Sequence, residues 1–263
     1  MIAQLTDRAV IAVSGPEARV FLQGLVTNDV NLVAQGNALY AALLTPQGKI
    51  LFDFLIAEGE GGLLLDCRRE ARDALVKRLS LYKLRAKVEI KPRDDLGVFA
   101  GIESGFADPR LPALGPRAIA PKGSVSSQSG PEAYLAVRLD LGVPEGSDFG
   151  SDRMFALDAG LDELRAVSFD KGCYVGQELT ARMKHRGTAR KRLIVVTTRD
   201  GGPLPDGDTS VTANGQEIGA ITSTYGARGF ALVRLDRLAE AAGASLDAGG
   251  AAVSLTKQTW LSA

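Results

Sequence analysis

Short apolar stretches alternate with polar turns through the first third of the chain, a pattern typical of strands in a layered fold. The strand-like runs are residues 9–13, 40–44, 50–57, 62–66 and a run that ends at Pro92. Pro46-Gln47-Gly48 and residues 58–61 are predicted hairpin turns between three of these runs. Helical spacing appears over residues 70–81 and after Glu17, which is predicted to form a capping box with Ser14. The pattern predicts an α+β layer.

The rest of the chain divides into a loop-rich middle and a β-rich end. Residues 104–131 are rich in glycine, proline and serine and are predicted to be a loop, after which residues 134–139 regain strand character. The last third has evenly spaced β-like runs with an Asn214-Gly215 hairpin turn, which predict a small antiparallel barrel. These runs are residues 193–198, 209–212, 217–222, 229–233 and 251–255. The predicted fold class is α+β, with residues 1–190 forming two interleaved α+β lobes and residues 191–263 a C-terminal antiparallel β-barrel.

The composition is that of an ordinary soluble protein, with 45% hydrophobic residues, 24% charged residues and a formal net charge of zero. A neutral chain argues against a general nucleic-acid or membrane surface, and the longest apolar runs are too short to span a bilayer. The start of the chain resembles neither a secretory signal nor a transit peptide, and two cysteines make no disulfide or zinc framework. We therefore predict a cytoplasmic protein. With His185 as its one histidine, we expect no stably bound metal.

One stretch indicates chemistry: Lys171-Gly172-Cys173-Tyr174-Val175-Gly176-Gln177-Glu178 places a thiol between two glycines, after a lysine and before a carboxylate. Glycines allow a tight turn or a close approach to a ligand, and a nearby cation favours the reactive thiolate. We predict that Cys173 is a reactive thiol and that Lys171 is its electrostatic partner. The alternative is a small buried thiol in a turn, which is the common state of a single cysteine.

A basic run without an acid follows this motif. Its cations are Arg182, Lys184, His185, Arg186, Arg190, Lys191 and Arg192. Such a run can attract the glutamate tail of a folate, an RNA or an acidic protein, or it can be a solvated loop whose cations pair with acids elsewhere. Direct binding of nucleic acid would rest on this run alone, and we do not expect it.

The Lys-Gly-Cys-Tyr-x-Gly-Gln-Glu string resembles the signature of the YgfZ-type folate-binding proteins, relatives of the aminomethyltransferase (T-protein, GcvT) of the glycine cleavage system. Segments 178–182 and 190–193 look most like the mitochondrial iron–sulfur assembly branch and its bacterial counterparts. The resemblance covers most of the chain and is densest in residues 134–193. It implies a GcvT-like fold and a tetrahydrofolate-binding accessory factor for assembly or repair of 4Fe–4S clusters, including those of tRNA-modifying enzymes. The implied partners are iron–sulfur assembly proteins and their client enzymes.

The resemblance also implies folate-binding residues. In aminomethyltransferases an Arg-Leu-Glu-x-Gly segment supplies the carboxylate that binds the pterin, and Asp140 takes the matching place in the segment 138–142, one methylene shorter. Asn28 ends a Phe-Leu-Gln-Gly-Leu-Val-Thr-Asn stretch similar to the family's first helix and loop, and Arg182 is assigned to the folate as well. The alternative is that Asp140 caps a turn and Asn28 ends a helix.

One departure from the resemblance concerns activity. Aminomethyltransferases carry a Gly-Gly-x-x-Asp-Asp segment with the catalytic aspartate, and residues 48–53 are the counterpart here, with Phe52 in place of one acid. A phenyl ring neither accepts a proton nor orients an amine. Asp53 is either the remaining acid or a polar residue that alternates on a strand. We therefore expect a folate binder without turnover, with a folate-dependent aminomethyl- or methyltransferase as the alternative.

Overall fold

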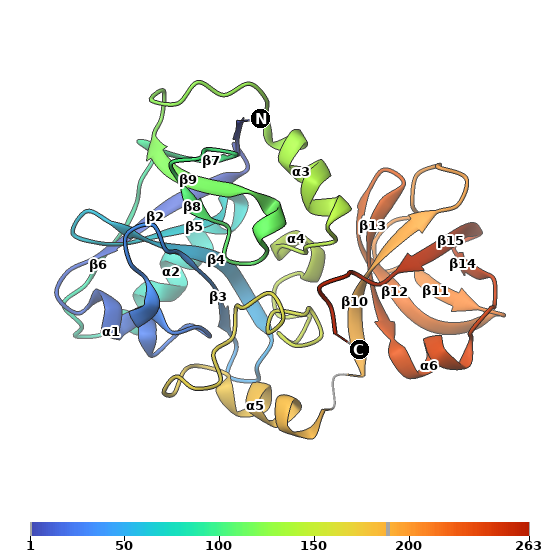
Figure 1. Cartoon of the computed structure of the whole chain (residues 1–263). Coiled ribbons are helices and arrows are strands. Elements are labelled where there is room, and N and C mark those ends of the chain that lie inside the picture. Colours follow the sequence, from blue (N-terminus) through green and yellow to red (C-terminus); the bar gives the residue numbers. More distant parts are fainter. Residues whose placement is uncertain (1, 188–189, 263) are drawn as a thin grey trace.

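A computed structural model describes residues 2–187 and 190–262. It contains an N-terminal α+β region and a C-terminal barrel (Figure 1). The larger sheet has the order β3-β4-β5-β2-β6, and all of its neighbouring strands are antiparallel. These strands are β2 (Arg8–Ser14), β3 (Leu39–Leu44), β4 (Ile50–Gly59), β5 (Gly62–Arg68) and β6 (Glu89–Pro92). A second antiparallel sheet of β1 (Ala3–Gln4), β7 (Leu96–Ala100), β8 (Phe106–Ala107) and β9 (Pro116–Pro121) has the order β1-β7-β9-β8.

Both faces of the larger sheet are buried. Strand β3 shows this best, because Leu39, Ala41 and Leu43 belong to one core while Tyr40 and Leu44 belong to another. The first core lies under the helices α1 (Ala18–Gln23) and α2 (Arg72–Lys83) and the short helix η1 (Val30–Leu32), while the short helix η2 (Arg69–Ala71) has no buried residue. The second core joins the sheet to β7, to the helix α3 (Pro131–Asp140) and to the barrel. A strand that is buried on both faces has a continuous apolar sequence, as β3 has.

The C-terminal barrel is closed, with the strand order β10-β13-β12-β11-β14-β15, and the predicted α+β class with an antiparallel C-terminal barrel is confirmed. Its strands are β10 (Lys191–Thr198), β11 (Ser210–Ala213), β12 (Gln216–Tyr225), β13 (Arg228–Arg234), β14 (Leu246–Ala248) and β15 (Ala251–Thr256). A short helix, α6 (Leu235–Glu240), follows β13. The predicted hairpin at Asn214-Gly215 joins β11 to β12, whereas α6 and β14 were not predicted.

Three local predictions are wrong. Residues 134–139 lie in the helix α3 rather than in a strand, because Tyr134 and Arg138, one helical turn apart, both point into the core. The predicted loop 104–131 contains β8, β9 and the short helix η3 (Pro112–Leu114). The Ser14–Glu17 capping box does not form, since the Glu17 carboxylate accepts a hydrogen bond from the backbone N–H of Lys87 at 2.7 Å.

A long irregular segment connects α3 to the barrel and contains the short helix α4 (Gly146–Phe149) and the helix α5 (Gln177–Arg186). Several side chains of this region bind the barrel and the tail that follows it: Asp148 accepts hydrogen bonds from Ser223 and Tyr225, and Trp260 donates to the carbonyl of Leu141. No helix in the described ranges is long and apolar enough to cross a membrane.

Candidate functional site

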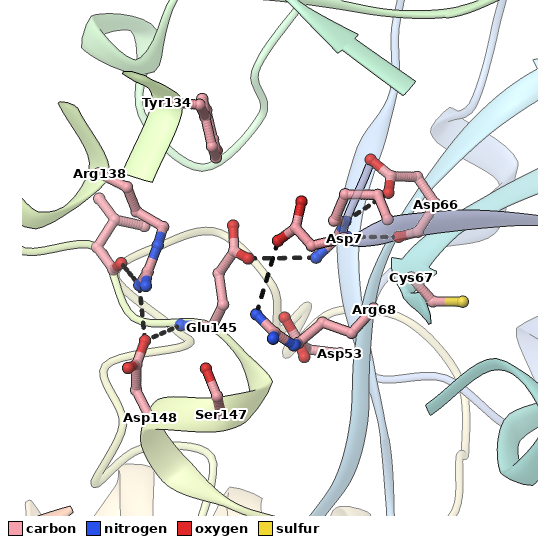
Figure 2. Close-up of polar contacts among 12 residues, drawn as sticks. Asp7, Asp53, Asp66, Cys67, Arg68, Tyr134, Arg138, Glu145, Ser147 and Asp148 are labelled. Atoms are coloured by element: carbon pink, nitrogen blue, oxygen red, sulfur yellow. Dashed lines mark hydrogen bonds and ion pairs between the residues drawn. The ribbon is translucent and has the colours of Figure 1, made fainter. Parts of the chain in front are cut away.

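Two cavities meet at Arg68, where β5 ends and α2 and α4 begin. The larger, about 380 Å³, is lined by Asp53, Cys67, Arg68, Gly146 and Phe149 among others. The smaller, about 270 Å³, shares Arg68 and reaches residues of α3 and Glu145. Figure 2 shows these side chains converging from β4, β5, α3 and the α4 segment. The larger cavity is of the size in which proteins hold small ligands.

Glu145 is the centre of a buried ionic network beside the cavities. Its carboxylate pairs with Arg8 at 3.3 Å and with Arg110 at 2.7 Å, and all three side chains are at most 3% exposed. Arg8 also pairs with Asp66 at 2.7 Å, and Arg117 binds the other oxygen of Asp66 at 2.8 Å. Burial alone would raise the pKa of Glu145, but Arg8 and Arg110 outweigh it and hold that pKa well below its usual range. The network joins both sheets to the segment before α4.

Asp53 is the buried acid that lines the larger cavity, whose wall also includes the exposed Glu70. Its Oδ2 accepts a hydrogen bond from the Tyr40 hydroxyl at 3.0 Å, and its Oδ1 accepts none from the residues described. Burial raises the pKa of Asp53, and the charge of Glu145 raises it further, while Arg8 opposes the shift. A Cβ at Gly146 would lie 2.8 Å from Oδ1, so a glycine at this position gives the carboxylate its room.

Phe52 packs against the core under α1 and α2, and it also lines the larger cavity. Its neighbour Asp53 lies on the opposite face of β4, because side chains alternate along a strand. Replacing one acid of the aminomethyltransferase pair by Phe52 thus leaves the cavity with a proton acceptor at Asp53.

Arg68 is the cation that lines both cavities. Among the residues described, Arg68 pairs with Glu70 at 3.0 Å and with Asp7 at 3.9 Å, and the side chains of these acids are 68% and 42% exposed. Exposed pairs contribute about 0–1 kcal/mol, so Arg68 can exchange these partners for a ligand anion at little cost. Figure 2 shows its side chain extending between Asp7 and Asp53.

The motif of residues 171–178 forms a loop on the surface that leads into α5. Lys171 is 7% exposed, and its ammonium donates to the carbonyls of Gln23, Val26 and Asn28 at 2.6–2.9 Å. A lysine has three N–H donors, so all of them bind the turn after α1. Burial lowers the pKa of Lys171 to about 8, although Asp29 opposes this shift. Lys171 therefore fixes the loop and has no N–H donor left for the Cys173 thiol, while its electrostatic effect on that thiol stays a prediction.

The two glycines of the motif differ in their surroundings. Gly176 has φ +82°, and a Cβ there would lie 2.5 Å from the carbonyl oxygen of Thr45, so α5 docks on the β3–β4 hairpin through bare backbone. Gly172 has nothing within 4 Å of the place where its Cβ would be. Only Gly176 is demanded by the fold.

The remaining motif residues have separate tasks. Cys173 is solvent-exposed, whereas Tyr174 is 7% exposed and belongs to the core. Gln177 begins α5, and Glu178 lies in its first turn, where the helix dipole favours a negative charge. The loop therefore buries the side chains of Lys171 and Tyr174 and presents the thiol to solvent.

The structure does not bring the three predicted folate residues to the central cavities. Asn28 is 7% exposed, and its side-chain amide donates hydrogen bonds to the backbone carbonyls of Tyr40 and Arg165 at 2.8 and 2.7 Å. The amide therefore links two backbone segments. Asp140 ends α3 and pairs with Arg228 of the barrel, with its side chain 63% exposed. Arg182 lies on the exposed face of α5. Their roles toward folate stay predictions.

Comparisons with known proteins identify the chain's relatives. Residues 190–263 match the family model described as CAF17, C-terminal beta-barrel domain. "Iron-sulfur cluster assembly factor IBA57, mitochondrial" of Mus musculus is 35% identical over 283 residues, covering 89% of this chain and 78% of that protein. The Homo sapiens protein of the same name is 34% identical, with the same coverage of both chains. The chain belongs to the IBA57 family.

The fold also matches a solved structure, the glycine cleavage system aminomethyltransferase T from Bartonella henselae. Its TM-score is 0.76, with 18% sequence identity, and the match covers 99% of this chain and 86% of that one. This likeness confirms the GcvT-like fold predicted from the sequence. The IBA57 relatives are named as mitochondrial, while the cytoplasmic location of this chain stays a prediction.

The central site of this IBA57-family chain was missed by sequence reasoning, apart from Asp53. Arg8, Arg68 and Glu145 lie far apart in sequence and in no short motif. The available signal was a charge inside an apolar strand, such as Asp66 after three leucines, because such a charge is buried and must be paired. Among the residues described, no group of three or more His, Cys, Asp or Glu side chains is placed to hold a metal ion.

Proposed function

We propose that this chain is a tetrahydrofolate-binding accessory factor for the assembly or repair of 4Fe–4S clusters, including those of tRNA-modifying enzymes. The observation that carries the proposal is that Cys173 is exposed on a loop. The neighbouring residues Lys171, Tyr174 and Gly176 fix this loop to the rest of the protein. The names of the IBA57 relatives support the cluster-assembly role.

Cluster chemistry requires more thiolates than this chain has. A stably held cluster takes about four ligands, and the chain has two cysteines, of which Cys67 is buried. Cys173 can therefore supply one ligand to a cluster whose other ligands belong to a partner protein. In this scheme the cluster is cargo, and the partner is an iron–sulfur assembly protein or a client enzyme.

The folate is proposed to bind in the two cavities at Arg68. The free Oδ1 of Asp53 can accept from a ring N–H or an amine of the pterin, and Arg68 suits a carboxylate of the glutamate tail. A donor at Asp53 would also favour its ionised form, against the burial that raises the pKa of this carboxyl.

Two matched variants test where the pterin lies. Asp53→Asn should weaken tetrahydrofolate binding roughly 10- to 100-fold in calorimetry, since a hydrogen bond to a charged group contributes about 1.5–3 kcal/mol. Asp140→Asn, the control, should bind as the wild type does. The reverse pattern would return the pterin to Asp140, as the sequence predicted, and equal binding by both variants would remove the folate from the central cavities.

The cluster-assembly role is tested in cells that lack the native protein. Expression of this chain should restore the activity of 4Fe–4S enzymes and of the tRNA modifications that depend on them. Restored growth without a change in 4Fe–4S enzyme activity would contradict the proposal.

The alternative, aminomethyl transfer, is supported by the position of Asp53 and opposed by the loss of the second acid at Phe52. We expect no turnover of glycine-cleavage intermediates by the purified protein. Turnover well above the uncatalysed background would make the transferase the preferred function.

A further inference from the structure

One face of the N-terminal region exposes apolar side chains that the fold leaves uncovered. Six large apolar side chains are exposed among the residues described, and four of them lie on the helices that cover one face of the larger sheet. They are Val20 on α1, Leu32 on η1, and Leu81 and Leu84 at the end of α2, and Leu84 is the most exposed of the six at 89%. Single apolar residues on a surface are ordinary, whereas a group on one face indicates a binding surface.

Hydrogen bonds connect the elements that carry these side chains. The Glu17 carboxylate, at the start of α1, accepts a hydrogen bond from the backbone N–H of Lys87 at 2.7 Å, which joins α1 to the turn after α2. Arg19 of α1 donates to the carbonyls of Val30 and Val33 at 3.0 and 3.1 Å, which joins α1 to η1. Figure 1 shows α1 and β6, the strand into which this turn leads, at the end of the molecule opposite the barrel. The exposed apolar side chains therefore lie on neighbouring elements at one end of the molecule.

Positive charge is concentrated at the end of α2. No acid occurs between Asp73 and Glu89, and none of the cations between them forms an ion pair among the residues described, since Asp73 pairs with Arg72 and Glu89 with Lys91. These cations are Lys77, Arg78, Lys83, Arg85 and Lys87. Lys77 and Arg78 precede Leu81 by four and three residues, so they share its face of the helix. We define the α2 tip as Leu81, Lys83, Leu84, Arg85 and Lys87.

The backbone at Leu84 is strained. This residue ends α2 with φ +43° and ψ −108°, a conformation that favours glycine because a Cβ crowds the neighbouring backbone. Glycine is common just after a helix, so a leucine at this position lowers the stability of the fold. Strained residues are concentrated at functional sites. A leucine that is both strained and exposed therefore indicates a binding role for its side chain.

We propose that the α2 tip docks on a bilayer that contains anionic phospholipids. In this arrangement Leu81 and Leu84 insert among the headgroups, and the cations of the tip meet the lipid phosphates. The contact is peripheral, and no helix in the described ranges could span the bilayer. The inference is independent of the proposed function, because the α2 tip contains no residue of the two central cavities or of the motif at residues 171–178.

The composition of the α2 tip favours a bilayer over a protein as the partner. Protein interfaces are depleted in lysine, and leucine and valine are under-represented among their energetically dominant residues. Exposed leucines beside lysine and arginine are typical of segments that lie on a membrane, where long cationic side chains keep their charge in water. The zero net charge of the chain argues against a general membrane surface, whereas this cluster of cations is local.

Sedimentation with lipid vesicles tests the docking. The purified chain should bind vesicles of equal parts phosphatidylglycerol and phosphatidylcholine, and it should bind vesicles of phosphatidylcholine alone at least tenfold more weakly. Added salt should weaken the binding, since salt screens exposed charges. Absence of binding, or equal binding to the two kinds of vesicle, would overturn the proposal.

A pair of charge variants locates the surface that binds. Arg85→Gln/Lys87→Gln should weaken binding to the phosphatidylglycerol vesicles roughly 25-fold, because each cation near an anionic membrane contributes about fivefold. Lys122→Gln/Lys257→Gln is the matched control, since it removes two exposed lysines outside the α2 tip, and it should bind as the wild type does. Equal losses in the two variants would mean that the chain adsorbs through its overall charge, and the α2 tip would not be the docking site.

Leu84→Gly separates membrane binding from stability. The change relieves the strain at φ +43°, so the variant should melt no lower than the wild type, while its vesicle binding should fall roughly tenfold because an inserted leucine is lost. The control is Val137→Ala, at an exposed apolar side chain on α3, and it should bind as the wild type does. Unchanged binding by Leu84→Gly would mean that the cations alone adsorb to the vesicles, and the proposal would fail.

A labelled polyglutamate peptide tests an acidic protein as the other possible partner of the α2 tip. The peptide offers charge without an apolar surface, so the wild type and Leu84→Gly should bind it equally. A chain that binds the peptide through Leu84 and does not sediment with the vesicles would assign the α2 tip to a protein and overturn the proposal.

Discussion

The centre of the molecule and the surface around Cys173 differ in whether their charged side chains are paired with opposite charges. At the centre, Glu145 is buried and paired with both Arg8 and Arg110. Around Cys173, the cations Arg182 and Arg186 meet no acid among the described residues. A paired charge builds structure, whereas an unpaired one is free for a partner, so the two regions are expected to respond differently to substitution.

The largest expected effect is on the central network. Glu145→Ala leaves two buried arginines without their shared acid, and breaking a buried pair costs roughly 3–5 kcal/mol of folding free energy. Urea denaturation would measure this loss. Glu178→Ala, at an exposed carboxylate on α5, is the control and should cost under about 1 kcal/mol. If Glu145→Ala lowers the free energy of unfolding as little as Glu178→Ala does, the two regions do not differ in the way described.

The next largest expected effect is the difference in stability loss between alanine substitutions at the two motif glycines, Gly176 and Gly172. Gly176→Ala forces a non-glycine residue to φ +82° and against the Thr45 carbonyl, so it should cost at least about 1–3 kcal/mol. Gly172→Ala meets open space and should lie within about 0.5 kcal/mol of the wild type. Melting temperatures of the two proteins check this. Equal losses would mean that Gly172 is also required by the fold.

A smaller, pH-dependent effect is expected at Asp53. Its pKa is raised in the folded protein, above an unfolded value of about 3.9, so ionisation opposes folding. The penalty is absent below the unfolded pKa, grows as the pH rises through the folded pKa and then stays constant. The stability of Asp53→Asn relative to the wild type should therefore increase from about pH 4 upward in urea titrations. A difference that is constant with pH would show that Asp53 has an ordinary pKa.

The two cysteines should differ in reactivity without any effect on stability. Burial raises the pKa of Cys67 to about 12, and the thiolate is the nucleophile, while Cys173 is exposed. Alkylation with iodoacetamide near neutral pH, followed by mass spectrometry, should label Cys173 at least a hundredfold faster. Comparable rates would indicate that the cavity beside Cys67 admits solvent and reagent.

The surface region was predictable from the sequence, and the central one was not. The motif around Cys173 is contiguous, so its eight residues could be read together, and strand patterns such as residues 50–57 correctly located β4. The central network joins Arg8, Arg110 and Glu145 across long sequence separations that no local pattern records. Helix α3 was misread because its buried Arg138 looks polar in sequence, although its guanidinium binds Asp148 at 2.6 Å in the interior.

The loop around Cys173 shows the limit of motif reading. The contacts of Lys171 could not be predicted from the motif, because the carbonyls that bind its ammonium belong to residues 23–28. Neighbours in sequence share a motif without sharing a contact.

The most direct test of the account compares Cys173→Ser with Cys67→Ser in cells that lack the native protein. Cys173→Ser should melt at the wild-type temperature and fail to restore 4Fe–4S enzyme activity, since the exposed thiol supports no packing. Cys67→Ser alters a thiol that lies in the core at 1% exposure, and once its abundance is matched it should restore activity fully. Full restoration by Cys173→Ser would contradict the claim that this surface acts through its thiol.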